Sequence, residues 1–114
     1  MIRLHYSEHT PMSIDIDFVG ECWLWHAEKA SWHFITLPQD KSEEIKYFSE
    51  NIQGKRRGWG AVKVTATIGK TCWETSIFPS SQLDAYILPI KSDVRKKEQI
   101  FPGNDVSVKL KINL

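Results

Sequence analysis

The stretch that decides the predicted fold is Ala61–Ile77, AVKVTATIGKTCWETSI. Apolar and polar residues alternate before Gly69-Lys70, and β-type residues resume after it, as expected for two half-buried strands. A glycine in the first of two linking positions supplies the positive φ of a type II′ turn, so the stretch predicts a β-hairpin. The turn also sets the register. The expected pairs are Ile68–Thr71, Ala66–Trp73, Val64–Thr75 and Val62–Ile77 on the apolar side, and Thr67–Cys72, Thr65–Glu74 and Lys63–Ser76 on the other side.

Four more segments have the character of strands. They cover residues 14–24, 32–37, 85–89 and 106–112. Gly20 interrupts the alternation of the first segment and marks a bulge or a bend. Pro79-Ser80-Ser81 is expected to break the strand that follows the Gly69 turn, and Pro102-Gly103-Asn104 is expected to turn the chain into the last strand.

Two helices are predicted between these strands. The first begins with Asp40 or Ser42 as its cap and stops near Gly54, because Ile45, Phe48 and Ile52 recur at helical spacing. The second is short, capped by Ser92 and ending at about residue 97. Residues 34–38 with Ser42 and residues 86–89 with Ser92 repeat one pattern of strand, proline and helix, which predicts pseudo-symmetric halves.

Six strands and two short capping helices predict a mainly β fold, a small six-stranded β-barrel or pseudo-barrel. Strands that are apolar on one side must bury that side and hide their edges, and a barrel does both. Residues 14–114 are expected to form this single domain. Residues 1–13 contain Pro11 and mixed charges without a period, so we expect a flexible leader.

The composition limits the function. Fifteen Lys and Arg against fourteen Asp and Glu give a formal charge of +1, which lacks the overall basic field of a nonspecific nucleic-acid binder. No segment has the length and apolarity of a membrane span, and no secretory signal is evident. Cys22 and Cys72 lie far apart in sequence, which favours reduced thiols in a cytoplasmic protein. We expect no membrane partner and a monomer or weak dimer.

Two strings carry a family resemblance, RRGWGAVKVTATIGKTCWETSIFP at residues 56–79 and YILPIKSDVRKKEQIFPGNDVSVKL at residues 86–110. They resemble the bacterial family described as domain of unknown function 1905, from about Phe18 to Ile112. The resemblance implies a small pseudo-barrel of the double-split type and no defined activity. Residues 88–89, 94–95 and 102–106 are more distantly similar to the AbrB and MazE swapped-hairpin transcription factors, which again implies a barrel more than a function.

The loop Gly54–Gly60, GKRRGWG, is a candidate site. Arg56 and Arg57 could contact phosphates while Trp59 stacks on a base or sugar. Alternatively, the glycines permit tight turns and Trp59 closes the open end of the barrel. With Lys91 and Arg95 of the second helix, the arginines would form a basic rim for nucleic acid or a small anionic ligand. The charges of that helix spread around it, which is also typical of a solvated surface.

Trp23 and Trp25 pose a second question. They alternate with the inward residues of the first strand and therefore fall on its outer face. We expect the leader or a helix to cover them, because a soluble monomer rarely exposes two indoles. The alternative is an exposed apolar patch that binds a partner or a flat ligand.

Metal binding and catalysis have little support in the sequence. His5 and His9 have helical spacing but precede Pro11, and His26 and His33 supply two ligands without a third, so we expect no metal and no cofactor. A nucleophilic Cys72 would need a nearby base and an electropositive setting, whereas its predicted neighbours are Thr67, Lys63 and Glu74 on an outer sheet face.

The predicted function is therefore a non-catalytic cytosolic binding module of unknown ligand. Two alternatives stay open: a nucleic-acid-binding or transcription-related module that uses the basic rim, and an enzyme at the barrel mouth that uses Cys22, Cys72 or His33.

Overall fold

The computed structural model describes the backbone of residues 3–7, 10–51 and 60–113 and the side chains of residues 13–49 and 60–112. The strands are β1 (Arg3–Ser7), β2 (Thr10–Ala27), β3 (Ala30–Thr36), β4 (Val62–Ile68), β5 (Thr71–Ser80), β6 (Ala85–Pro89) and β7 (Asp105–Asn113). The helices are α1 (Gln39–Asn51) and α2 (Ser92–Glu98).

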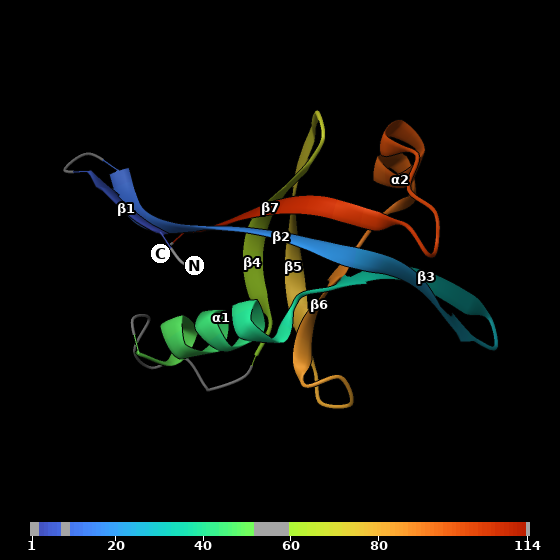
Figure 1. The fold of residues 1–114 in the computed structure, drawn as a ribbon, viewed down its shortest axis with the longest axis horizontal. Helices are drawn as coiled ribbons and strands as arrows, with labels where there is room; N and C mark the ends of the chain where they lie inside the picture. Colours follow the sequence, from blue (N-terminus) through green and yellow to red (C-terminus); the bar gives the residue numbers. More distant parts are fainter. Residues whose placement is uncertain (1–2, 8–9, 52–59, 114) are drawn as a thin grey trace.

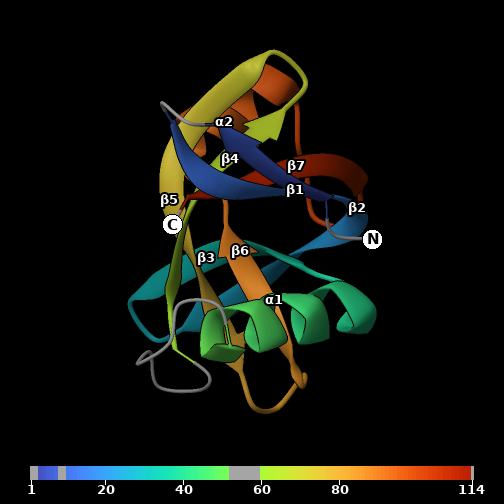
Figure 2. The same cartoon turned by 90° about the vertical axis from the view of Figure 1, so that its left-hand side faces the viewer.

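Six of these strands close into an antiparallel barrel (Figure 1). The order around it is β2, β3, β6, β5, β4 and β7, and β7 pairs back with β2. Strand β1 lies outside the barrel and pairs with the first part of β2. The two helices lie at opposite ends of the barrel (Figure 2). The prediction of a mainly β, six-stranded barrel with two helices is confirmed, although α1, with 13 residues, is longer than a short cap.

The hairpin of β4 and β5 has the predicted register at every pair from Val62–Ile77 to Ile68–Thr71. Gly69 has a φ of 58°, as the type II′ turn requires. The carboxylate of Glu98 in α2 accepts hydrogen bonds from Thr71 Oγ1 at 2.6 Å and from the Lys70 amide at 3.3 Å. These bonds fix α2 against the turn.

Within the barrel, strand β2 is shared between two partners. Residues 13–21 pair with β7, and residues 22–27 pair with β3. Gly20 lies where the partners change, and a β-carbon there would stand 2.6 Å from both Ile35 Cγ2 and the Thr36 carbonyl oxygen. The glycine therefore lets β2 pass close over β3, which explains the bend that the sequence indicates at this point.

The first barrel strand begins earlier than predicted. We expected it near Ile14, but β2 begins at Thr10, and residues 3–7 form β1 beside it. Strand β3 pairs with β2 only from residue 22 onward, so the same edge of β2 is open at residues 10–15, and β1 pairs with it there. The flexibility of residues 1–13 stays a prediction.

Three local predictions were wrong. Ser42 does not cap α1: it lies in the first turn, and its hydroxyl accepts a hydrogen bond from the Tyr86 amide at 2.9 Å, which ties the helix to β6. The cap of α2 is Lys91, which makes no side-chain cap hydrogen bond, and Ser92 is the first helical residue. Pro79 does not break β5 but pairs with Tyr86 inside it. The pairing of β4 with β5 ends at Ile77, so no strand lies beside Pro79 on the β4 side. The missing N–H of the proline therefore costs no hydrogen bond on that side.

The predicted turn before the last strand is confirmed. Gly103 has a φ of 95°, and the Asn104 amide donates to the Phe101 carbonyl at 3.0 Å, as in a type II turn with Pro102 before the glycine. The Gly103 amide and the Asn104 carbonyl both bond to the backbone of Cys22 at 2.7 and 2.9 Å. This turn therefore fastens the start of β7 to β2 at Cys22.

The interior of the barrel is filled by the inward residues of all six strands together with residues of both helices. Among the fully buried side chains are Ile14, Ile16, Ile35, Ile45, Ile77, Tyr86, Leu88, Val94, Val108, Leu110 and Ile112. Trp73 is partly buried and packs against this core. The inward assignment of the hairpin is therefore confirmed.

The two segments of the sequence echo lie side by side. Strands β3 and β6 pair through Phe34–Pro89, Ile35–Leu88 and Thr36–Ile87. Equivalent backbone hydrogen bonds close the two ends of this pairing: the Leu37 amide donates to the Tyr86 carbonyl at 3.0 Å, and the Ile90 amide donates to the His33 carbonyl at 2.9 Å. Such an arrangement is expected of two halves related by a local pseudo-twofold axis.

Candidate binding face on the outside of the barrel

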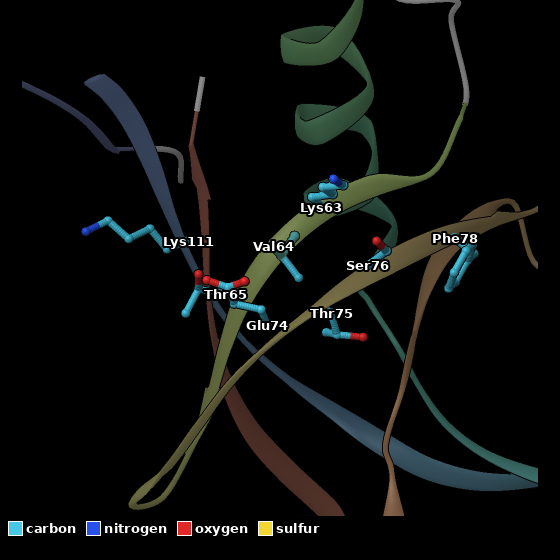
Figure 3. A pocket seen from close by; sticks show the side chains of 8 residues that line it. All are labelled: Lys63, Val64, Thr65, Glu74, Thr75, Ser76, Phe78 and Lys111. Atoms are coloured by element: carbon cyan, nitrogen blue, oxygen red, sulfur yellow. The ribbon is translucent and has the colours of Figure 1, made fainter. Parts of the chain in front are cut away.

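The outer surface of the barrel has two regions of opposite chemistry. Over β4, β7 and the first half of β5 it is polar and charged, and a shallow hollow of about 620 Å³ lies there. Its lining includes Lys63, Thr65, Glu74 and Lys111 (Figure 3). Figure 3 shows Lys63 and Lys111 spread apart, with Glu74 beside Thr65. Charges of both signs that do not converge are typical of a solvated surface.

The other region, the aromatic face, lies over β2, β3, β6 and the end of β5. It is a hollow of about 410 Å³ lined by the five aromatic residues Trp23, Trp25, Trp32, Phe34 and Phe78 and by Ser80, Gln82, Ile87 and Pro89. No charged side chain lines this hollow in the described part of the chain. The inward side chains of the same strands fill the barrel core, so this part of the sheet is apolar on both surfaces. An uncovered second apolar surface is typical of a binding site.

The sheet register places the rings in rows. Trp25 pairs with Trp32, and Trp23 pairs with Phe34. The Trp32 and Phe34 rings are within 10° of parallel, with centroids 6.3 Å apart, and the Trp23 and Phe34 centroids are 5.2 Å apart. Trp23 Nε1 donates a 2.7 Å hydrogen bond to Thr36 Oγ1. This hydrogen bond and the ring contacts hold the base of the face in one arrangement.

The expectation that Trp23 and Trp25 are both covered is wrong for Trp25. Trp25 is 46% exposed, Trp32 is 53% exposed and Phe78 is 43% exposed, whereas Trp23 is half-buried against Phe34. Trp25 stays exposed with both described helices in place, so neither of them covers it. The alternative, an exposed apolar patch, describes this surface.

The sequence analysis missed Trp32, Phe34 and Phe78 as members of the same face. A signal for the first two was present, because the segments around Trp23 and Phe34 are apolar at consecutive positions and lack strict alternation. Phe78 could not be assigned to the face, because it lies directly before the expected end of its strand at Pro79 and reaches the face only through the pairing of β5 with β6.

The predicted basic rim is only partly visible. Arg56, Arg57 and Trp59 lie outside the described residues. Lys91 is exposed, and Arg95 is half-buried with its Nε donating to the Ile90 carbonyl at 3.2 Å. Both belong to the end of the barrel where α2 meets the β4–β5 turn. The described chain resumes at Gly60, before the opposite end of β4, which is about 20 Å away for a seven-residue strand (Figure 1). A role of these five residues in binding stays a prediction.

Among the candidate catalytic residues, Cys22 is not an activated nucleophile. Cys22 is buried, and burial raises the pKa of its thiol even though the positive charge of Arg95 acts in the opposite direction. Burial also lowers the pKa of His33 below its ordinary 6.5, and Arg95 and His26 act in the same direction. Cys22 is thus a protonated thiol near pH 7, which is a poor nucleophile. Cys72 is exposed, and neither cysteine is in a disulfide.

Two further properties concern the described residues alone. They contain no cluster of three or more His, Cys, Asp or Glu side chains that could hold a metal ion. His5 lies in β1, so its spacing to His9 is not that of a helix, and His9 lies outside the described residues. Neither described helix has the length and apolarity to cross a membrane.

Comparisons with known proteins give one result. A comparison with curated proteins found no match. A family model matches residues 18–110, which include the barrel strands from the middle of β2 to β7, both helices and all nine lining residues of the aromatic face. Because the match covers most of the chain, the protein belongs to the family described as domain of unknown function (DUF1905).

Proposed function

We propose that the protein is a small, non-catalytic binding module that holds an uncharged ligand against the aromatic face. The observation that carries the proposal is the hollow of about 410 Å³ with five aromatic side chains and no charged one among its described lining. Its volume lies within the range of about 300–1,000 Å³ of small-molecule sites. A few polar groups, on Ser80, Gln82 and the exposed indoles, accompany the rings and can orient a ligand.

The exposed area sets the strength of binding. An aromatic side chain has about 150–250 Å² of surface, so the exposed parts of Trp25, Trp32 and Phe78 amount to at most about 350 Å². At about 25 cal/mol per Å² their burial contributes up to about 9 kcal/mol, and association costs at least about 4 kcal/mol. The difference of at most about 5 kcal/mol corresponds to dissociation constants of about 0.2 mM or higher, and the ligand's own hydrogen bonds and apolar area lower them.

The cellular setting is also part of the proposal. Cys22 and Cys72 are both free thiols, and a small domain that keeps two unpaired cysteines fits a reducing compartment, the cytoplasm of a bacterium. The protonated state of Cys22 supports a non-catalytic role.

The test uses the indole N–H resonances of the ¹⁵N-labelled protein. We expect indole, cyclohexanol and N-acetylprolinamide at millimolar concentration to shift the resonances of Trp25 and Trp32, and we expect inorganic phosphate to leave them unchanged. Trp32→Ala should remove the response. Lys63→Ala, a control on the charged outer region, should preserve it. If none of the three neutral compounds moves either resonance, the aromatic face is not a binding site for uncharged ligands.

A further inference from the structure

We infer that the occupant of the aromatic face is a short proline-rich peptide segment in the polyproline II conformation. This inference rests on the binding function proposed above and names the chemical class of the ligand. It is argued from the charge of the face, its hydrogen-bonding groups, its dimensions and its rigidity.

The charge of the face selects against ionic ligands. The described lining offers no cation for a phosphate or a carboxylate and no carboxylate for a lysine or an arginine. Nucleic acids are bound mainly through contacts of basic side chains to phosphates, which this face does not provide. The segment that docks here is therefore uncharged along the part that makes contact.

The hydrogen-bonding groups of the face are mainly donors. The indole N–H groups of Trp25 and Trp32 make no hydrogen bond within the described residues, whereas that of Trp23 is used by Thr36. The Ser80 hydroxyl oxygen already accepts from the Leu83 amide at 3.3 Å, so its hydrogen is available to donate. The acceptors of the described lining side chains are the Gln82 amide oxygen and the remaining lone pair of Ser80 Oγ, whereas both side chains and the two indoles can donate.

A proline-rich segment complements a face of donors. Proline has a backbone carbonyl but no N–H, and the carbonyls of a polyproline II helix make no internal hydrogen bonds. Such a segment brings acceptors that exposed indoles can satisfy and brings no donor that would be left unpaired. Sugar hydroxyls and the N–H groups of ordinary extended peptides need acceptors, which this face scarcely offers.

The dimensions of the face fit a segment of four or five residues. Adjacent strands lie about 4.8 Å apart, so the distance across the sheet from β2 to β5 is about 14 Å. A polyproline II helix rises about 3.1 Å per residue and covers that distance with four or five residues. Trp23, Phe34 and Pro89 lie in one register row across three of these strands, and Trp25 and Trp32 form the next row. The rows offer parallel ridges of rings.

Rigidity on both sides favours this ligand. The nearly parallel Trp32 and Phe34 rings and the hydrogen-bonded Trp23 are in place before any ligand arrives. Polyproline II is likewise formed in the free peptide, so little conformational entropy is lost, and aromatic grooves recognise proline-rich segments elsewhere for this reason. A second copy of the chain is a weaker candidate, because at most about 350 Å² of exposed aromatic surface is well below the roughly 800 Å² per partner of a stable dimer.

The experiment compares decaproline with a (Gly-Ser)₅ peptide of equal length, again by the indole resonances. We expect decaproline to shift Trp25 and Trp32 at concentrations at least tenfold lower than (Gly-Ser)₅ does. Trp32→Ala should weaken the binding of decaproline at least tenfold. Trp32→Phe, which keeps a ring but lacks the N–H, should weaken it about fivefold, the effect of one lost hydrogen bond. Thr65→Ala on the charged outer region is the matched control and should leave it unchanged.

The outcomes are distinct. If N-acetylprolinamide and indole bind but decaproline acts no better than (Gly-Ser)₅, the peptide inference is wrong and the proposed function stands. If no neutral probe binds, both are wrong. If sedimentation shows a dimer that Trp32→Ala dissociates, the occupant is a second copy and the peptide inference is overturned. Because Trp32 is 53% exposed, its variants should keep the fold, which far-ultraviolet circular dichroism checks.

Discussion

Gly20→Ala is predicted to loosen the crossing of β2 over β3. The new β-carbon would stand 2.6 Å from Ile35 Cγ2 and 2.6 Å from the carbonyl oxygen of Thr36. The isoleucine side chain can rotate, but the carbonyl belongs to a strand that is paired with Ile87 of β6. Relief of the clash therefore requires β2 to move away from β3, which disturbs the strand that carries Trp23 and Trp25.

The expected loss of stability is about 2 kcal/mol. Overpacking of a core costs about 1–3 kcal/mol, and the upper half applies to Gly20→Ala because one of the two clashes is with backbone. The lower entropy of alanine in the unfolded chain offsets about 0.5 kcal/mol. For a domain of this size a net 2 kcal/mol lowers the melting temperature by about 8 °C. The urea midpoint falls by about 1 M at an m-value of about 2 kcal/mol per M.

Gly103→Ala is the matched control for this measurement. A β-carbon there has no heavy atom within 4 Å, so only the φ of 95° opposes the substitution, at about 1 kcal/mol. Urea unfolding followed by tryptophan fluorescence should rank the wild type first, Gly103→Ala second and Gly20→Ala last. If Gly20→Ala is as stable as the wild type, the argument that the glycine is needed for the close crossing is refuted.

Three other predictions concern the turn and the titratable groups. Gly69→Ala should lower the free energy of unfolding by about 1–2 kcal/mol because of the left-handed φ, and further because the new β-carbon meets the Glu98 carboxylate. The loss should therefore be smaller when the substitution is made in a Glu98→Ala variant. Equal losses in the two backgrounds, measured by urea unfolding, would contradict the contact. Ellman's reagent should modify the exposed Cys72 quickly, and it should modify the buried Cys22 only on unfolding or at a pH above the ordinary thiol range. Equal rates of modification of the two thiols would disprove the burial of Cys22. The pKa of His33 is below 6.5 in the folded protein, so the unfolded chain binds more protons as the pH falls through 6.5, and the free energy of unfolding should decrease in this range. His33→Gln should flatten this dependence on pH. An unchanged slope in the variant would speak against the shift.

The hairpin of β4 and β5 shows what the sequence can predict. Its register depends only on local features, which are the alternation of apolar and polar residues and a two-residue turn that begins with glycine. These features are compatible with one register, and the structure has that register from Val62–Ile77 to Ile68–Thr71. The closed barrel followed from the number of half-apolar strands, because each needs a neighbour on both edges.

The errors arose where a residue depends on a partner far away in the sequence. Ser42 was assigned to a helix cap, yet its hydroxyl bonds to the Tyr86 amide 44 residues later. Pro79 was assigned to a strand end, yet it is accommodated because only β6 pairs with β5 at that point. The aromatic face is the same kind of feature, since Phe78 joins Phe34 only through the intervening strand β6. Local patterns indicate which residues face outward but not which of them meet.

The aromatic face divides into a base and an edge, and this division is the reason for assigning it a binding role. Trp23 and Phe34 form the base, where ring contact and the Thr36 hydrogen bond hold the side chains against the sheet. Trp25 and Trp32 form the edge, where among the described residues each pairs only with the other strand of its hairpin. A cross-strand pair is worth about 0.2–1 kcal/mol, which is small compared with about 2–3 kcal/mol for fully burying one large apolar side chain. Trp25 and Trp32 therefore add little to the stability of the barrel. They keep unused hydrogen-bond donors and exposed apolar area next to the rigid pair of Trp23 and Phe34, and a ligand can bind there with little loss of side-chain entropy.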